Sequence, residues 1–347
     1  MCKRDLIWSL LLACGFSAVA TAAVPDKVLS ADGTAIGTGQ ISSITPTKVV
    51  LQMSAGEKEF ATNEFAQIAF EGEPGTLRTV RKYVLEGNYE NALDVLEKVQ
   101  VTDVMRKEIS VDVDFYKAYA SGKMALAGNG DLKETGQLLF AFCNANQTSY
   151  HYFQAVELLG DLLVADRLFD KAAQYYALLA EAPWPDYKMR AGVAMGRACL
   201  AQKKIPEALK AFDGVLAITA EGDDAERLRT AASLGKLRCQ AETGKPEEVI
   251  KKVEEIIAKT DPEKSDILAQ AYLILGSAYR KAGKNKEALF AYLHVDVLYP
   301  GHADSHAEAL ANMIDLFSGM QKNDLANRAK QTLMERYPTS PWAQPQQ

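Results

Sequence analysis

Two histidines near the end of the chain have a spacing that can bind metal. His302 and His306 lie four residues apart, which can place two imidazoles on one helix face, as a zinc site requires. Pro300 and Gly301 directly precede them, so His302 falls at or before the start of the predicted helix. We therefore interpret both histidines as solvated loop and first-turn residues, and we predict no metal site.

The sequence lacks the motifs of common enzyme classes. It contains no GxSxG, HExxH, Walker-type or GxGxxG stretch. The run Gly37-Thr38-Gly39 lies between strand-like residues, and no helix follows it to hold a phosphate. Paired acids such as Glu247-Glu248 fall at helix starts, where they favour the helix dipole. We expect no catalytic residues and no cofactor.

Composition and charge narrow the class of protein. The chain has 347 residues, of which 48% are hydrophobic and 24% charged, so it can bury a core. Its formal net charge is −6, and removing Lys3, Arg4 and Asp5 with the N-terminal segment would leave −7. This acidity disfavours nucleic-acid binding and polybasic attachment to anionic lipid.

The first 23 residues have the features of a secretory signal. Lys3 and Arg4 precede an apolar run from Leu6 to Val19, and Ala20-Thr21-Ala22 offers a small-x-small cleavage site. The run is too short to span a bilayer comfortably. We predict a signal peptide at 1–23 and an exported protein of the periplasm or cell envelope.

A lipid anchor is the alternative. Leu11 to Gly15 resembles a bacterial lipobox, in which Cys14 would be lipidated and become the first mature residue. The apolar run before Cys14 is brief and continues past it, so an outer-membrane lipoprotein remains the minor interpretation.

Three further cysteines lie on predicted helices. Cys143, Cys199 and Cys239 are odd in number and show no CxxC spacing, so a disulfide framework is not supported. We interpret them as small buried hydrophobes. A Cys199–Cys239 bridge is disfavoured because neighbouring helix axes lie about 8–10 Å apart.

Residues 24–74 have the pattern of a small all-β unit. Turn signals such as Asp32-Gly33 and Thr45-Pro46 separate five strand-like runs, at 26–30, 35–44, 48–54, 57–62 and 65–70. Their spacing resembles an Sm-like or SH3-like barrel. So small a unit buries little surface and should lean on the helices that follow.

The stretch Tyr272 to Pro300 resembles a tetratricopeptide (TPR) repeat. It carries the family's large residue, Leu-Gly, Tyr, Ala, aromatic and terminal Pro, at Tyr272, Leu275-Gly276, Tyr279, Ala288, Tyr292 and Pro300. The spacing recurs, because Gly160 and Ala172, Gly196 and Ala208, and Gly276 and Ala288 are each twelve residues apart. Tyr176, Phe212 and Tyr292 follow their alanines by four residues. A constant offset indicates a constant helix-packing geometry.

The resemblance implies a mainly α protein, a TPR-type α-solenoid of six or seven helix pairs over 75–340, preceded by the β unit. Residues 341–347 are predicted to be a flexible tail. The pair around Gly235 departs from the pattern, because its turn glycine, Gly244, comes two residues late. We expect Val249 and Val253 to take the small and aromatic places there.

In this family the first helix of each pair lines a concave surface, at positions six and three before the glycine and one, four and five after it. Counting from Gly196, Gly235 and Gly276 places six basic residues on that surface: Arg190, Arg197, Arg229, Lys236, Arg280 and Lys281. Such a stripe would attract an acidic segment or a C-terminal carboxylate. The alternative is that these residues form an ordinary solvated face.

The sequence thus predicts a non-catalytic exported scaffold or adaptor that binds a protein or peptide in the cell envelope. The rival hypothesis is an envelope-anchored receptor or enzyme accessory in which the β unit recognises the ligand.

Overall fold

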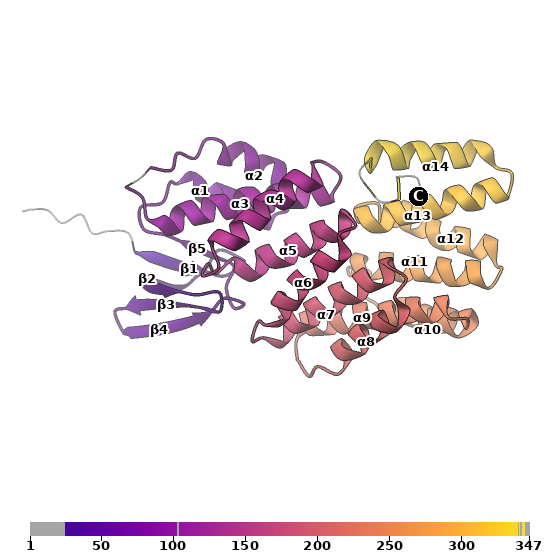
Figure 1. Ribbon diagram of the computed structural model, residues 1–347, viewed down its shortest axis with the longest axis horizontal. Helices are drawn as coiled ribbons and strands as arrows, with labels where there is room; N and C mark the ends of the chain where they lie inside the picture. Colours follow the sequence, from indigo (N-terminus) through magenta and orange to yellow (C-terminus); the bar gives the residue numbers. More distant parts are fainter. Residues whose placement is uncertain (1–24, 103, 339, 341, 344–347) are drawn as a thin grey trace, which may run out of the picture.

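A computed structural model describes residues 25–102, 104–338, 340 and 342–343. The predicted signal peptide, the alternative anchor at Cys14 and most of the predicted tail lie outside these residues. The described chain begins with a small antiparallel sheet and continues as a long series of helices (Figure 1).

The sheet contains the strands β1 (Asp26–Leu29), β2 (Ala35–Ile44), β3 (Lys48–Met53), β4 (Gly56–Ala61) and β5 (Gln67–Ala69). They are ordered β4-β3-β2-β1-β5, with every neighbouring pair antiparallel. Gly37 on β2 is needed for close packing, because a Cβ there would lie 2.4 Å from the ring of Phe60 on β4. The absence of a side chain at Gly37 thus lets the Phe60 ring pack directly against the backbone of β2.

The helices of the described residues form seven consecutive pairs, which confirms the predicted solenoid. Their bounds are α1 (Thr76–Leu85), α2 (Tyr89–Leu96), α3 (Lys107–Leu126), α4 (Leu132–Ala145), α5 (Tyr152–Ala165), α6 (Phe169–Ala180), α7 (Pro185–Ala201), α8 (Ile205–Leu216), α9 (Asp223–Glu242), α10 (Pro246–Lys259), α11 (Ser265–Lys281), α12 (Asn285–Leu298), α13 (Ala303–Gly319) and α14 (Asn323–Arg336).

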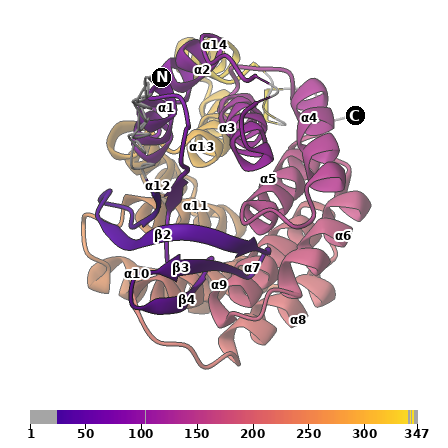
Figure 2. The same ribbon diagram turned by 90° about the vertical axis from the view of Figure 1, so that its left-hand side faces the viewer.

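The pairs wind around a common axis. Viewed from the sheet end, the first helices α3 to α13 lie toward the centre and the second helices lie outside them (Figure 2). The first helices also pack on one another in succession. The last pair returns to the same side as the first pair but lies farther along the axis (Figures 1 and 2). The first helices therefore form an inner surface.

Apart from the turn between α9 and α10, the turns within the described pairs share one backbone shape whether or not they contain glycine. Gly283, between α11 and α12, has a φ of 73°, and Arg167 has a φ of 61° in the matching turn between α5 and α6. In both turns the residue that follows the left-handed one donates its backbone N–H to a carbonyl five residues back, as Lys284 does to Tyr279. Left-handed φ favours glycine but can be imposed on other residues by such bonds.

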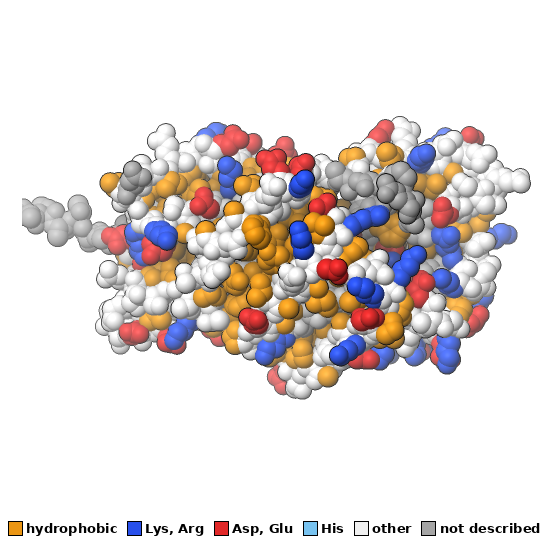
Figure 3. Space-filling model, viewed as in Figure 1, with side chains coloured by type: hydrophobic (Ala, Val, Ile, Leu, Met, Phe, Trp, Pro, Cys, Tyr) orange, Lys and Arg blue, Asp and Glu red, His pale blue; other side chains and the backbone are white. Residues whose placement is uncertain are grey.

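The sheet and the first helices share one hydrophobic core. A continuous cluster runs from Val28 and Leu51 in the strands through Phe115 on α3 to Ala191 on α7. The β unit therefore leans on the helices, as its size predicts. The surface itself mixes acidic and basic side chains, with apolar side chains gathered around α5 and α6 (Figure 3).

Two residues of the predicted tail are described. Trp342 and Ala343 pack beside the cluster that α13 and α14 form around Leu333. Among the described residues, no helix is both long and apolar enough to cross a membrane.

Candidate functional site

The inner surface is shaped by glycines that let the two helices of a pair approach closely. A Cβ on Gly160 would lie 2.5 Å from the ring of Tyr176, and the corresponding distance from Gly196 to Phe212 is 2.4 Å. The distance from Gly276 to Tyr292 is 2.6 Å. The partner alanines Ala172, Ala208 and Ala288 are completely buried. These contacts fix which residues of each first helix point inward.

The pair α9 and α10 follows a different register from the predicted one. Val249 and Val253 are buried in the small and aromatic places, as expected. Twelve residues before Val249 is Leu237, not Gly235. Gly235 instead faces the preceding pair, because a Cβ there would lie 2.3 Å from the ring of Phe212 on α8. The inward-facing position after the notch is therefore Arg238.

Arg197 and Arg238, each directly after the notch residue of its pair, reach across the inner surface in the same way. Arg197 on α7 donates to Gln270 Oε1 on α11 at 2.9 Å. Arg238 on α9 forms a two-pronged ion pair with Glu308 on α13. Each arginine thus reaches a first helix two pairs farther along the chain. Sequence analysis missed Arg238, and counting back from Val249 rather than from Gly235 would have found it.

The structure does not bring the six predicted residues together as an unpaired stripe. Four are held by carboxylates: Arg190 by Glu157 at 2.6 Å, Lys236 by Asp213 at 2.6 Å, Arg280 by Asp315 at 3.5 Å and Lys281 by Glu242 at 3.0 Å.

The shifted register of α9 explains where Arg229 and Lys236 lie. Arg229 donates to the Ala220 carbonyl in the loop before α9. Lys236 points toward Asp213 on the second helix α8, hence toward the outer side. The inner stripe predicted from Gly235 is therefore corrected by two residues, and these side chains do not join Arg197.

Arg197 has the most available guanidinium of the set. Its side chain is exposed, and no ion pair to it occurs within the described chain. Enclosure by the curved wall lowers the pKa of Arg197, although the charges of Asp161 and Asp304 oppose this effect. An arginine remains charged at neutral pH even so. Among the described residues its partner is a neutral amide, and such a charged planar fork can bind a carboxylate.

Asp161, on the neighbouring helix α5, is an unusual acid. Burial and the like charge of Glu157 raise the pKa of Asp161 to about 6, against the hydrogen bond that Tyr176 donates to it at 2.8 Å. The inner wall next to Arg197 therefore gains negative charge as the pH rises through about 6.

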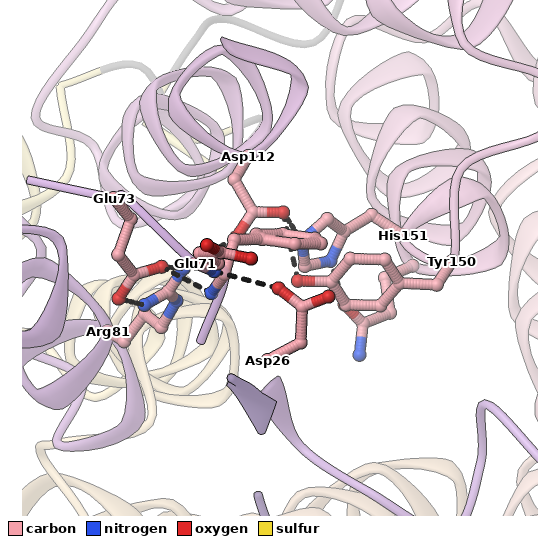
Figure 4. A network of polar contacts seen from close by, with 9 residues as sticks. Asp26, Glu71, Glu73, Arg81, Asp112, Tyr150 and His151 are labelled. Carbon is pink, nitrogen blue, oxygen red and sulfur yellow. Dashed lines mark hydrogen bonds and ion pairs between the residues drawn. The ribbon is translucent and has the colours of Figure 1, made fainter. Parts of the chain in front are cut away.

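A second polar cluster joins the β unit to the helices (Figure 4). Asp112 on α3, which is completely buried, accepts from Arg81 on α1 at 2.9 Å and from the Tyr150 hydroxyl at 2.9 Å. His151 Nε2 lies 3.2 Å from the same carboxylate. Arg81 also forms a two-pronged pair with Glu73, directly after the sheet.

This cluster resembles a catalytic arrangement in its residue types but not in its access. Burial would raise the pKa of Asp112, but the hydrogen bond and charge of His151 and the charge of Arg81 outweigh it and lower the pKa. The His151 ring stacks on Phe115 with centroids 3.6 Å apart. Because Arg81, Asp112 and His151 are all buried, the cluster is a clamp between sheet and helices.

A neighbouring ion pair extends the clamp. Asp26 on β1 is buried and accepts from the backbone of Ile41 and of Glu71. Its carboxylate also pairs with Arg106, just before α3, at 2.8 Å. Charged groups thus join the sheet to α1 and α3, in addition to the apolar packing.

The two C-terminal histidines have structural partners, and the prediction that both are solvated is wrong for His306, which is buried. His306 is buried between the Tyr337 hydroxyl at 2.8 Å and Asp296 at 2.7 Å, and His302 lies 2.9 Å from the Ser265 hydroxyl. Within the described ranges, no cluster of three or more potential metal ligands occurs.

Cys143, Cys199 and Cys239 are free and buried. Burial raises the pKa of Cys143 to about 12 and that of Cys239 to about 11, so both thiols are protonated at neutral pH.

Comparison with known proteins shows the fold alone. No protein-family model matches the chain, and no curated protein matches it. A crystal structure of Rap protein complexed with Competence and Sporulation Factor is similar, with 12% identity, a TM-score of 0.50, and coverage of 77% of this chain and 76% of that chain. The TPR domain of P58(IPK) aligns over 77% of this chain and 75% of its own, with 14% identity and a TM-score of 0.28, which is too loose to carry an argument. The chain thus has a TPR-like helical fold.

Proposed function

We propose that this protein is a non-catalytic scaffold or adaptor that binds a protein or peptide partner on its inner surface, around Arg197. The observation that carries the proposal is the exposure of the Arg197 side chain and the nature of its hydrogen-bond partner. This side chain is an exposed guanidinium inside a curved wall, held only by the neutral Gln270 within the described residues.

The chemistry of Arg197 favours a carboxylate on an extended segment, either an acidic side chain or a chain terminus. A guanidinium donates two parallel hydrogen bonds to a carboxylate, and these are stronger than its bond to an amide. Arg190 and Arg238 are already paired with Glu157 and Glu308, so a partner would have to compete for them. Arg197 would therefore be the anchor and its neighbours would contribute specificity.

The comparison agrees with a binding role. The Rap structure of similar fold is complexed with Competence and Sporulation Factor. Sites built on folds vary, so the proposal for this chain rests on Arg197 and its surroundings rather than on that likeness.

We further propose that the protein acts outside the cytoplasm, in the periplasm or cell envelope. This rests on the predicted signal at 1–23, with lipidation at Cys14 as the alternative. The β unit is proposed to be an Sm-like or SH3-like module, and the meander in which β1 lies between β2 and β5 supports this. Nucleic acid is not expected as a partner, because the chain is acidic.

The test is capture of partners from an envelope fraction by wild type and by Arg197→Glu. Charge reversal places like charges together, which costs several kcal/mol, so we expect capture to fall by about a hundredfold or more. Arg328→Glu on α14 is the matched control, because Arg328 is exposed and forms no ion pair within the described residues. It should capture as wild type does.

Unchanged capture by a folded Arg197→Glu protein would remove the inner-surface proposal and favour recognition by the β unit. Deleting 24–74 cannot separate these hypotheses, because it would remove Glu73 from buried Arg81 and expose the shared core. Substitutions on exposed strand residues such as Thr38 and Gln40 of β2 are the appropriate test of the β unit.

A further inference from the structure

We propose a second docking site, on the outer surface between α8, α9 and α10, that takes one bulky apolar side chain of an acidic peptide segment. This site is separate from the inner surface around Arg197. It follows from the irregular register of α9 and from the charges that surround the resulting hollow.

The hollow arises because this pair lacks the close notch of the regular pairs. Leu237 occupies the glycine place, and Val253 occupies the aromatic place opposite it. The pair therefore has no ring seated against a glycine, and α10 packs chiefly on α11 rather than on α9. Gly235 meanwhile receives Phe212, which holds α9 close to α8. α9 packs against both α8 and α10, and the three helices lie close together in Figure 1.

The hollow has an apolar floor and a basic rim. Its volume is about 320 Å³, and it is open to solvent. Leu216, Leu237 and Ile256 supply the apolar floor. The polar lining residues are Ser233, Lys236, Gln240, Lys252, Glu255 and Lys259.

The charge of the rim selects the occupant. Lys252 and Lys259 are exposed and form no ion pair within the described part of the chain, whereas Lys236 is held by Asp213. Glu255 is the one acid among the lining residues. A local excess of lysine on an acidic chain complements an acidic segment.

The size of the hollow selects how that segment binds. Pockets for small ligands typically measure about 300–1,000 Å³ and bury most of the ligand. A hollow whose volume is at the lower end of this range, and which is open to solvent, suits one anchoring side chain of a longer segment. A desolvated anchor with charges around it is the usual form of an interaction hot spot.

The test uses a fluorescein-labelled, blocked pentapeptide with a central phenylalanine and two acidic residues on each side, followed by fluorescence anisotropy. We expect saturable binding that weakens about tenfold or more when Lys252→Glu and Lys259→Glu are combined. Lys251→Glu is the matched control, because Lys251 lies on the same helix, is exposed and does not line the hollow. It should bind as wild type does.

A second variant tests the floor without changing charge. Ser233→Phe fills the hollow with the protein's own side chain, and it should weaken binding of the phenylalanine peptide to the level of the same peptide with a central alanine. Melting curves of each variant establish that it is folded.

The proposal is overturned if the peptide shows no saturable binding, if Ser233→Phe binds normally, or if Lys251→Glu weakens binding as much as the combined lysine variant. Loss of peptide binding in Arg197→Glu alone would assign the peptide to the inner surface. That result would end this proposal while leaving the proposed function intact.

Discussion

Replacing Asp112 with alanine should destabilise the protein more than any surface substitution. The side chain of Asp112 is completely buried and accepts from Arg81, Tyr150 and His151. The side chain of Arg81 is 2% exposed, so water cannot replace the lost carboxylate. Glu73 remains as its other partner.

The expected magnitude follows from these contacts. Removing one member of a buried ion pair costs about 3–5 kcal/mol, because the other charge stays buried. That is a large part of the roughly 5–15 kcal/mol by which domains are stable. Asp112→Asn keeps an acceptor oxygen but loses the charge, so it should fall between wild type and Asp112→Ala.

The assay is urea unfolding followed by circular dichroism, with Asp114→Ala as the control. Asp114 lies on the same helix but is exposed and forms no ion pair within the described chain, so its loss should cost less than about 0.5 kcal/mol. The pKa of Asp112 is lowered in the folded protein. Its stabilisation is therefore present above the unfolded-state pKa of about 3.9 and is lost as the pH falls through the folded value. Equal unfolding midpoints for Asp112→Ala and Asp114→Ala at pH 7 would refute the reasoning.

Two further predictions concern the helix notches and the inner wall. Gly276→Leu should destabilise the protein by about 3 kcal/mol or more, since its Cβ would lie 2.6 Å from the Tyr292 ring. The control is Gly214→Leu, which has open space around its Cβ and should be neutral or stabilising in the same thermal melts. Similar losses of stability in both variants would contradict the notch. Asp161, whose pKa is raised to about 6, binds more protons folded than unfolded between about pH 4 and 6, so its charge destabilises the protein above that range. Asp161→Asn should therefore melt higher than wild type at pH 7 and lose this advantage by pH 4, and a pH-independent difference would contradict the shift.

The regular part of the fold could be predicted from spacing along the chain. Glycine and alanine twelve residues apart, with an aromatic residue four later, are a local pattern, because each pair is a short hairpin. The strands of the β unit were likewise bounded by turn signals such as Asp32-Gly33. Both predictions depend on neighbours within about forty residues, where sequence spacing and spatial contact agree.

The register of α9 shows where such counting fails. Gly235 looks like a notch glycine, but in the structure it packs on Phe212 of the preceding pair rather than within its own pair. Only its position among three helices distinguishes the two uses of a glycine. The error moved the expected inner residue from Arg238 to Lys236.

What the sequence alone determined is the hairpin unit and its repetition, because a helix face and a tight turn are fixed by residues close together in the chain. What the tertiary structure decided is which charges meet. Arg197 finds Gln270 and Arg238 finds Glu308 about seventy residues away, while Arg81 and Asp112 join sheet to helices. These pairings depend on the winding of the whole array, in which small rotations between successive pairs accumulate.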